Sequence, residues 1–278
     1  MTATLLIAQL TDLHVGAEDD PSSAGNFARF AECLAAIGSA MRRPDLVLLT
    51  GDIAEKGDEA SYARVFSAME ALGVRWAATL GNHDDPGAFR AAAAQSETAF
   101  FKPGGVVEAG SWRIVLADTR REGRTGGYFD EARARLLDEM LAACPEVPTL
   151  LAIHHPPVAV GIDWIDPEPE AAWIGCLRKV LLRHRQVHQI ICGHVHVPVM
   201  TQFGGIPLSI APATAAQSWP ELAPYDPAAP DGRTMMVEGV PGFALHRLGE
   251  RAVTTLFCSA RPGATCLAHS APGNPAAD

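Results

Sequence analysis

The feature that most constrains the fold of this chain is a series of short apolar segments separated by amphipathic ones. In the first half the apolar segments lie at residues 4–10, 45–50 and 75–80, and the amphipathic ones at 27–42 and 59–72. Apolar runs without polar alternation are typical of strands buried on both faces. The order of segments therefore predicts β-α-β-α-β units in a layered α/β sheet.

Each of these predicted strands ends in residues of the types that bind metal ions. The endings are Asp12-Leu13-His14, Gly51-Asp52 and Gly81-Asn82-His83-Asp84, and two later strands end at His154 and at Gly193-His194-Val195-His196. Carboxyl ends of strands form the crevice where open α/β sheets place their sites. Asp and His one residue apart project the same way from an extended chain, so each such pair can chelate one ion.

The mixture of carboxylate, imidazole and amide groups indicates the kind of metal. These groups suit two divalent or trivalent transition-metal ions (Mn, Fe, Zn or Co) better than an all-oxygen Ca or Mg site or a thiolate zinc site. A carboxylate between two such ions can bridge them, and Asp52 is the candidate for that role.

The second half of the chain predicts antiparallel pairing and therefore a mixed sheet. Residues 106–107 and 112–117 flank a turn and predict a hairpin. Helices are expected at 130–143 and about 170–184, with strands at 149–153 and 189–192. Five further strands, at 197–202, 207–210, 234–237, 243–248 and 253–257, are expected to complete a second sheet. Residues 218–232 predict a loop near the site, and 259–278 a partly disordered tail rich in Pro, Gly and Ala.

Charge and cysteine content exclude several classes of protein. With 22 basic and 32 acidic residues the net charge is -10, and no stretch gathers Lys or Arg, so a nucleic-acid polymer is not an expected partner. The apolar start lacks a basic leader and is too short to span a membrane, which predicts a cytoplasmic protein without a membrane partner. Six cysteines without a C-x-x-C pair predict buried thiols, although a bridge between Cys258 and Cys266 stays open.

The ordered set D-x-H, G-D, G-N-H-D, a strand-terminal His and G-H-x-H resembles the calcineurin-like metallophosphoesterase superfamily, over about residues 4–200. Within it, the segments starting at His154-His155-Pro156-Pro157 resemble bacterial class III cyclic-nucleotide phosphodiesterases and glycerophosphodiesterases. The resemblance implies a four-layer α-β-β-α sandwich of two mixed sheets. It implies one domain at residues 1–258, with a cap and dimer contact within about 203–258, ahead of the tail at 259–278.

The resemblance also implies a ligand set and a catalytic residue. One metal would take Asp12, His14, Asp52 and His196, and the other Asp52, Asn82, His154 and His194. His83 would lie outside the metal ligands, stabilising charge or protonating the leaving oxygen, with Asp84 or another acceptor orienting it. No further cofactor is expected. The partners are a small phosphodiester and a second copy of the chain, in a homodimer or higher homo-oligomer.

Several other polar and aromatic residues have competing interpretations. His155 is expected to support the site, since neighbouring strand residues face opposite ways. Asp118 either touches the site or caps a turn. Three aromatic residues either line a cleft or pack in the core or an interface, and four histidines are expected on the surface. The aromatic residues are Trp164, Trp219 and Tyr225, and the histidines are His184, His188, His246 and His269.

The predicted function is hydrolysis of small phosphodiesters, either 3′,5′-cyclic nucleotides or glycerophosphodiesters, by attack of a metal-bound hydroxide. A phosphomonoesterase is the first alternative. Phosphatases of this superfamily place an Arg soon after G-D and carry G-N-H-E, whereas this chain has Ile53-Ala54-Glu55 after Asp52 and ends the later motif in Asp84. The second alternative is a binding scaffold, which predicts missing ligands, and no motif position is missing here.

Overall fold

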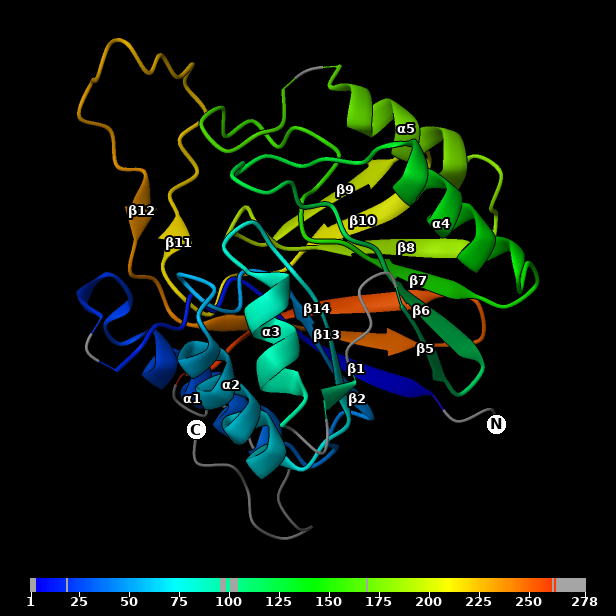
Figure 1. Cartoon of the computed structure of the whole chain (residues 1–278), viewed down its shortest axis with the longest axis horizontal. Helices are drawn as coiled ribbons and strands as arrows, with labels where there is room; N and C mark the ends of the chain where they lie inside the picture. Colours follow the sequence, from blue (N-terminus) through cyan, green and yellow to red (C-terminus); the bar gives the residue numbers. More distant parts are fainter. Residues whose placement is uncertain are drawn as a thin grey trace, which may run out of the picture.

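Two six-stranded mixed sheets, packed face to face, form the centre of the computed structural model, which describes residues 4–18, 20–95, 99–100, 105–168, 170–261 and 263 (Figure 1). The first sheet has the order β14 (Val253–Ser259), β13 (Gly242–Leu248), β1 (Leu5–Leu10), β2 (Leu46–Thr50), β3 (Trp76–Thr79) and β4 (Ala99–Phe100). The second has the order β5 (Val106–Ala109), β6 (Trp112–Leu116), β7 (Thr149–Ala152), β8 (Val187–Cys192), β10 (Ile206–Ile210) and β9 (Val199–Phe203).

Helices cover the outer face of each sheet. The first sheet carries α1 (Asn26–Ser39), α2 (Glu59–Leu72) and α3 (Pro86–Ala93), and the second carries α4 (Glu131–Ala142) and α5 (Ala172–Leu181) (Figure 1). This is the predicted four-layer α-β-β-α sandwich, and the predicted hairpin is present as β5 and β6. The sequence pattern did not predict α3, whose first turn is fixed by Asp85 accepting a hydrogen bond from the backbone N–H of Ala88 at 2.7 Å.

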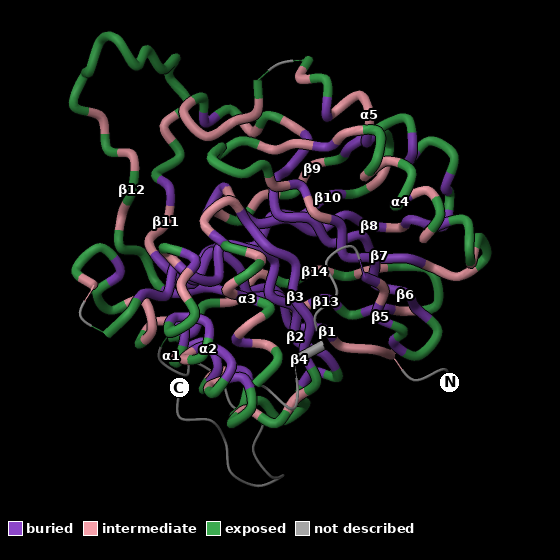
Figure 2. The backbone as a smooth tube through the Cα atoms, viewed as in Figure 1, coloured by how far each residue is buried: buried purple, intermediate pink, exposed green. Residues whose placement is uncertain are grey.

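The strand sequences explain why the sheets stack. In β1, Ala8 and Leu10 point to the core beneath α1 to α3, whereas Ile7 points to the core between the two sheets. The same division holds in β2, where Leu49 lies in the core beneath the helices and Leu48 lies in the core between the sheets. Strands that are apolar on both faces must be covered on both, so a second sheet and a layer of helices are required (Figure 2).

The prediction that all five C-terminal strands complete the second sheet was wrong for three of them. Only β9 and β10 join that sheet, whereas β13 pairs antiparallel with β1 and β14 pairs with β13, in the first sheet. The short strand β12 (Met236–Val237) pairs with β11 (Gln217–Ser218) in an arm that projects from the body (Figure 1). Short strands contain little information about their partner, because pairing is decided by contacts distant in sequence.

The beginning of the predicted tail is part of the packed structure. β14 continues to Ser259, and the guanidinium of Arg261 forms two hydrogen bonds with the carboxylate of Glu32 on α1, at 2.7 and 3.0 Å. Most of the remaining tail lies outside the described residues, and so does Cys266, the partner considered for Cys258.

Two of the four histidines expected on the surface are buried. His246, on β13, has no exposed surface because it lies between the sheets, and His184 is 7% exposed because it packs beside α4 and binds Asp138 at 2.7 Å. His188 is half-buried, and His269 lies outside the described residues. A polar residue can face the core when it finds hydrogen-bond partners there. The local sequence does not show those partners, so it did not predict the burial of these histidines.

Candidate metal centre

The predicted ligands converge at the carboxyl ends of β1, β2, β3, β7 and β8. Five of them have left-handed backbone conformations, with φ of 51° at Asp12, 47° at His14, 49° at Asp52, 73° at His194 and 64° at His196. Such conformations are costly for residues other than glycine and persist where the surrounding structure enforces them, as at functional sites. The turns they produce direct the side chains into one crevice.

Close glycine contacts allow these strand ends to approach one another. Gly51 has φ of 98°, and a Cβ there would overlap the imidazole of His154. A Cβ at Gly81 would overlap the carboxylate of Asp52. The glycines therefore do more than turn the chain, because a larger residue at either position would push a predicted ligand out of the crevice.

One group of predicted ligands forms around His14. Its Nε2 lies 3.2 Å from Nε2 of His196 and 3.7 Å from Oδ2 of Asp52. Nε2 of His196 also lies 3.4 Å from Oδ1 of Asp12. Ligands around one transition-metal ion are separated by roughly 2.9 to 3.4 Å for metal–nitrogen distances near 2.1 Å. The spacing of Asp12, His14 and His196 therefore fits one ion, and Asp52 lies slightly farther from His14.

A second group forms around His154, which has no exposed surface. Its Nε2 lies 3.3 Å from Oδ2 of Asp52 and has no hydrogen-bond partner among the described residues. Its ring stands 5.3 Å from the ring of His194, measured between centroids. A buried nitrogen without a partner is costly unless another group binds it, and a metal ion would do so. Oδ2 of Asp52 thus lies near one ring of each group, His14 and His154.

Backbone carbonyls and one carboxylate fix which nitrogen of each ring faces the crevice. Nδ1–H of His154 donates to the carbonyl of Thr50 at 2.8 Å, Nδ1–H of His196 to that of Ala216 at 2.7 Å, and Nδ1–H of His14 to Oε2 of Glu55 at 2.7 Å. The Nε2 lone pairs of the three rings are thereby directed into the site. This is the arrangement that histidine ligands of metal ions adopt.

The electrostatics of the crevice favour positive charge. Burial by itself would lower the pKa of His154, but the adjacent Asp52 and Asp12 carboxylates raise it to about 9. The pKa of His14 is also raised, since Glu55 and Asp52 outweigh the effect of burial. The pKa of the Asp52 carboxyl is held well below its usual range despite burial, chiefly by His154. The donor set and its charge therefore fit cations of the transition-metal type.

His83 and Asp84, which follow the predicted ligand Asn82, have separate roles in the structure. Nδ1–H of His83 donates to the carbonyl of Glu55 at 2.9 Å, so Glu55 and not Asp84 orients this ring. The carboxylate of Asp84 instead accepts backbone N–H groups of Ile53, Ala54 and Gly81 and the hydroxyl of Tyr62. Asp84 thereby ties the loop after β2 to the loop after β3.

His155 supports the site, as the sequence predicted. Its Nε2 lies 3.2 Å from Oδ1 of Asn82, and its Nδ1 lies 2.9 Å from the hydroxyl of Thr119. The pKa of His155 is lowered by burial and by the neighbouring His194 and His154, so the ring stays neutral. A neutral ring at this place holds the Asn82 amide without adding charge.

Sequence reasoning missed Glu55 and Arg29. The guanidinium of Arg29 donates to the carbonyls of Thr214, Ala215 and Gly239 at 2.8 to 3.1 Å, which fixes the segment whose next carbonyl binds His196. The only local signal for Glu55 was an acidic residue in the loop after Asp52, and Arg29 gave none because its partners are far away in sequence.

The two groups of ligands open into a cleft of about 950 Å³. Trp164 lines this cleft, whereas Trp219 and Tyr225 are not among its lining residues and are exposed. Asp118 is also absent from the lining and binds Arg120, so its role is in the turn. The predicted ligands His14, Asp52, Asn82, His194 and His196 also line the cleft, together with His83, Thr125 and Met236.

Fold and site together define a metal-dependent hydrolase, and comparison with known proteins gives the family. The calcineurin-like phosphoesterase family model matches residues 5–198, and the chain belongs to this family. It is 31% identical over 226 residues to the 3′,5′-cyclic adenosine monophosphate phosphodiesterase CpdA of Pseudomonas aeruginosa, covering 78% of this chain and 79% of that protein. It is 29% identical over 204 residues to the probable glycerophosphodiester phosphodiesterase GpdQ of Arcobacter nitrofigilis, covering 69% and 72% of the two chains.

Among solved structures, a dimetal phosphatase from Danio rerio superposes with a TM-score of 0.62 at 16% identity, covering 92% of this chain and 99% of that one. At this identity the similarity concerns the fold. Among the described residues, no helix is long and apolar enough to cross a membrane.

Proposed function

We propose that this chain is a binuclear metal-dependent phosphodiesterase that hydrolyses small phosphodiesters, with 3′,5′-cyclic nucleotides as the first substrate class and glycerophosphodiesters as the second. The observation that carries the proposal is the orientation of the His14, His154 and His196 Nε2 atoms towards the carboxylates of Asp12 and Asp52. The activities for which the two relatives are named support the two substrate classes.

The proposed ligands divide around Asp52. Asp12, His14 and His196 would hold one ion and Asn82, His154 and His194 the other, with Asp52 shared by both. Mn, Fe, Zn and Co all accept such imidazole and carboxylate ligands. When bound, two such ions would neutralise the phosphate group and lower the pKa of water enough for attack near neutral pH.

His83 is the proposed proton donor to the leaving oxygen. Its Nδ1–H is held by the carbonyl of Glu55, and the Glu55 carboxylate lies 3.7 Å from the same nitrogen. Its Nε2 has no hydrogen-bond partner among the described residues, and the side chain lines the cleft with about a third of its surface exposed. A proton at Nε2 is therefore available to a substrate oxygen.

The pairing of the arginines that line the cleft favours a diester over a monoester. A monoester dianion is usually held by a free arginine or lysine, but the two arginines that line this cleft are both occupied. Arg29 binds three backbone carbonyls, and Arg261 pairs with Glu32. A singly charged diester needs no further cation beyond the metal ions.

We propose that the enzyme is a cytoplasmic homodimer or higher homo-oligomer without a nucleic-acid or membrane partner. The β11–β12 arm, with Trp219 49% exposed and Met236 40% exposed, is the proposed contact between copies. This contact is tested by comparing the sedimentation of the unaltered chain with that of a Trp219→Ser/Met236→Ser variant. If copies associate through the arm, the variant should sediment as a smaller species.

The function is tested by kinetics with Mn²⁺-supplemented and EDTA-stripped protein. Bis-p-nitrophenyl phosphate is compared with p-nitrophenyl phosphate, and 3′,5′-cyclic AMP is compared with glycerophosphocholine. We expect metal-dependent turnover with a preference for the diester, and the two natural substrates then rank the two classes. A preference for the monoester would assign the protein to the phosphatases, and no turnover by the Mn²⁺-supplemented protein would favour the scaffold.

A further inference from the structure

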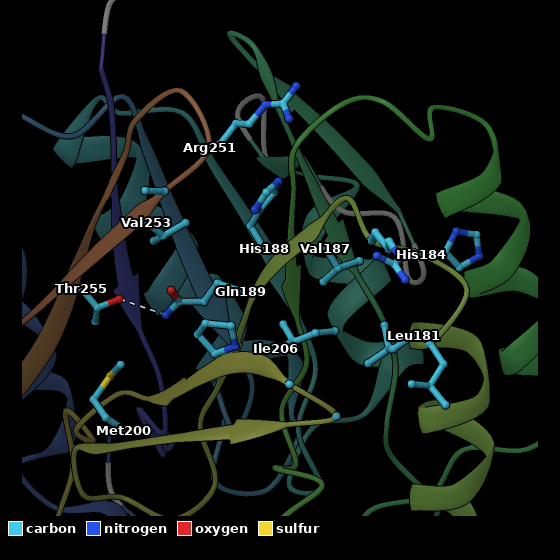
Figure 3. Close-up of a pocket in the computed structure, with 16 residues that line it drawn as sticks. Leu181, His184, Val187, His188, Gln189, Met200, Ile206, Arg251, Val253 and Thr255 are labelled. Carbon is cyan, nitrogen blue, oxygen red and sulfur yellow. Dashed lines mark hydrogen bonds between the residues drawn. The ribbon is translucent and has the colours of Figure 1, made fainter.

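A second cavity, of about 720 Å³, lies at the opposite end of β8 from the metal centre. β8 starts at Val187, which lines this cavity, and ends at Cys192, two residues before the predicted ligand His194. The other walls come from the end of α5, the turn between β9 and β10, and the turn between β13 and β14 (Figure 3). The cavity therefore touches both sheets and shares no lining residue with the metal cleft.

The charge of this cavity is opposite to that of the whole chain. Its lining includes Arg185, Arg251, His184 and His188 and, among the described residues, no Asp or Glu, although the chain carries a net charge of -10. His184 is occupied by Asp138. Arg185 and Arg251 are exposed and have no hydrogen bond or ion pair with any described residue. Two unpaired guanidinium groups at one cavity favour an anionic ligand.

The walls between the charged groups are apolar. Leu181, Val187, Ile206 and Val253 line the cavity, and Leu182 and Met200 at its edge are 66% and 57% exposed. A bare inorganic ion would leave this surface in contact with water. A small organic anion, with a carboxylate, phosphate or sulfonate joined to an apolar body, would cover it.

The lining polar residues Gln189 and Thr255 begin a chain of buried hydrogen bonds. Nε2 of Gln189, a residue only 3% exposed, donates to the hydroxyl of Thr255 at 3.0 Å (Figure 3). The Thr255 hydroxyl lies 2.9 Å from Nδ1 of His246, and Nε2–H of His246 donates to Oε1 of Gln9 at 2.9 Å. Burial lowers the pKa of His246 to about 4, so the ring is neutral and Nδ1 accepts the Thr255 hydroxyl hydrogen.

From Gln9 the chain reaches the metal centre. Nε2 of Gln9 donates to the Thr50 hydroxyl at 2.8 Å and to the Cys192 carbonyl at 2.9 Å. The carbonyl of the same Thr50 accepts Nδ1–H of His154 at 2.8 Å. This series of polar side chains crosses the otherwise apolar core between the sheets, where each member can keep its partner only if its neighbours keep theirs.

We propose that the cavity lined by Arg185 and Arg251 is an effector site for a small organic anion, whose binding changes the metal affinity of the centre through the chain from Gln189 to His154. The ligand would contact Gln189 and Thr255 directly, since both line the cavity. A change in the bond between them is passed to His246, Gln9 and Thr50, and so to the orientation of the His154 ring.

Binding is tested by calorimetric titration of the full, Mn²⁺-loaded chain with naphthalene-1-sulfonate. This probe has an apolar body and a single negative charge, and it lacks a phosphate or carboxylate that would chelate the metal. We expect the affinity to fall by about five- to tenfold in an Arg185→Ala/Arg251→Ala variant. Arg247→Ala, which removes an exposed arginine that does not line the cavity, should leave it unchanged. No binding, or equal binding by both variants, would overturn the proposal.

The effect on the metal centre is measured as Mn²⁺ affinity of the stripped chain with and without saturating naphthalene-1-sulfonate. We expect a shift of about fivefold in the unaltered chain. His246→Phe removes the ring nitrogens that join Thr255 to Gln9 at similar volume and does not alter the cavity lining, so this variant should bind the probe but lose the shift. Binding without any shift in the unaltered chain, or an equal shift in His246→Phe, would contradict an effector role. Both readouts are binding constants, so they stay separate from the test for phosphodiesterase turnover.

Discussion

The Nε2 atoms of His14 and His196 lie 3.2 Å apart, although 182 positions separate the two residues in the chain. Each ring already donates its Nδ1–H to a fixed acceptor, so two lone pairs face each other across this gap. Such a contact is repulsive unless a positive charge lies between the nitrogens. A shared proton or a metal ion can supply that charge, and the adjacent Asp12 and Asp52 carboxylates select for the same kind of occupant.

Asp52→Ala should abolish activity and the binding of a pair of metal ions while leaving a folded chain. Asp52 contacts both His14 and His154, so its loss removes the carboxylate shared by the two groups of ligands. Metal content per chain, turnover and circular dichroism measure the outcome. Asp226→Ala, in an exposed loop, is the control and should behave as the unaltered chain. Retained turnover in Asp52→Ala would disprove the bridging assignment.

His83→Ala should keep both metal ions and lower kcat by about 100- to 10,000-fold, because its proposed role is proton transfer and its side chain is not among the proposed ligands. His83→Gln separates proton transfer from hydrogen bonding, since an amide can donate a hydrogen bond but does not deliver a proton at neutral pH. Near-normal kcat in His83→Gln would rule out the acid role, and loss of metal from His83→Ala would make His83 a ligand.

Glu55→Gln should weaken metal binding by about tenfold or more. The carboxylate of Glu55 orients His14 through the 2.7 Å bond to Nδ1 and makes that ring a more basic ligand. The amide keeps an acceptor oxygen but removes the charge. Titration with Mn²⁺ measures the effect, and Glu59→Gln, an exposed acid on α2, is the matched control. Equal Mn²⁺ affinity in the two variants would show that the Glu55 charge has no part in metal binding.

His246 should make the chain sensitive to mild acid. Its folded pKa of about 4 lies below the ordinary 6.5, so the folded state favours the neutral ring. The stabilisation is fully present above pH 6.5 and is lost as the pH falls towards 4. Between pH 7 and pH 5 this amounts to about 2 kcal/mol for a fully buried ring. Urea unfolding at both pH values should show a smaller acid-induced loss for His246→Gln than for the unaltered chain. Identical losses would show that His246 does not titrate in this way.

Much of the architecture could be predicted from the sequence because its signals are local. The apolar periods of β1 to β3 and the amphipathic period of α1 and α2 gave the layered sheet, and the hairpin β5–β6 followed from its turn. The helix α3 was missed since it has only eight residues, too few for a clear period. The pairing of β13 with β1 was also missed, because residues 5 and 248 meet only once the whole domain has folded.

The sequence by itself determined which chemical groups stand at the strand ends: the spacing of Asp12 and His14, the glycine before Asp52, and the pair His194 and His196. These are local facts, since strand geometry and glycine conformations depend on a few neighbouring residues. Only the tertiary structure decided that Glu55 orients His14 and that His246 lies buried between the sheets. Those contacts join segments that approach one another when the sheets pack, and the burial that gives them their strength does not exist before that packing.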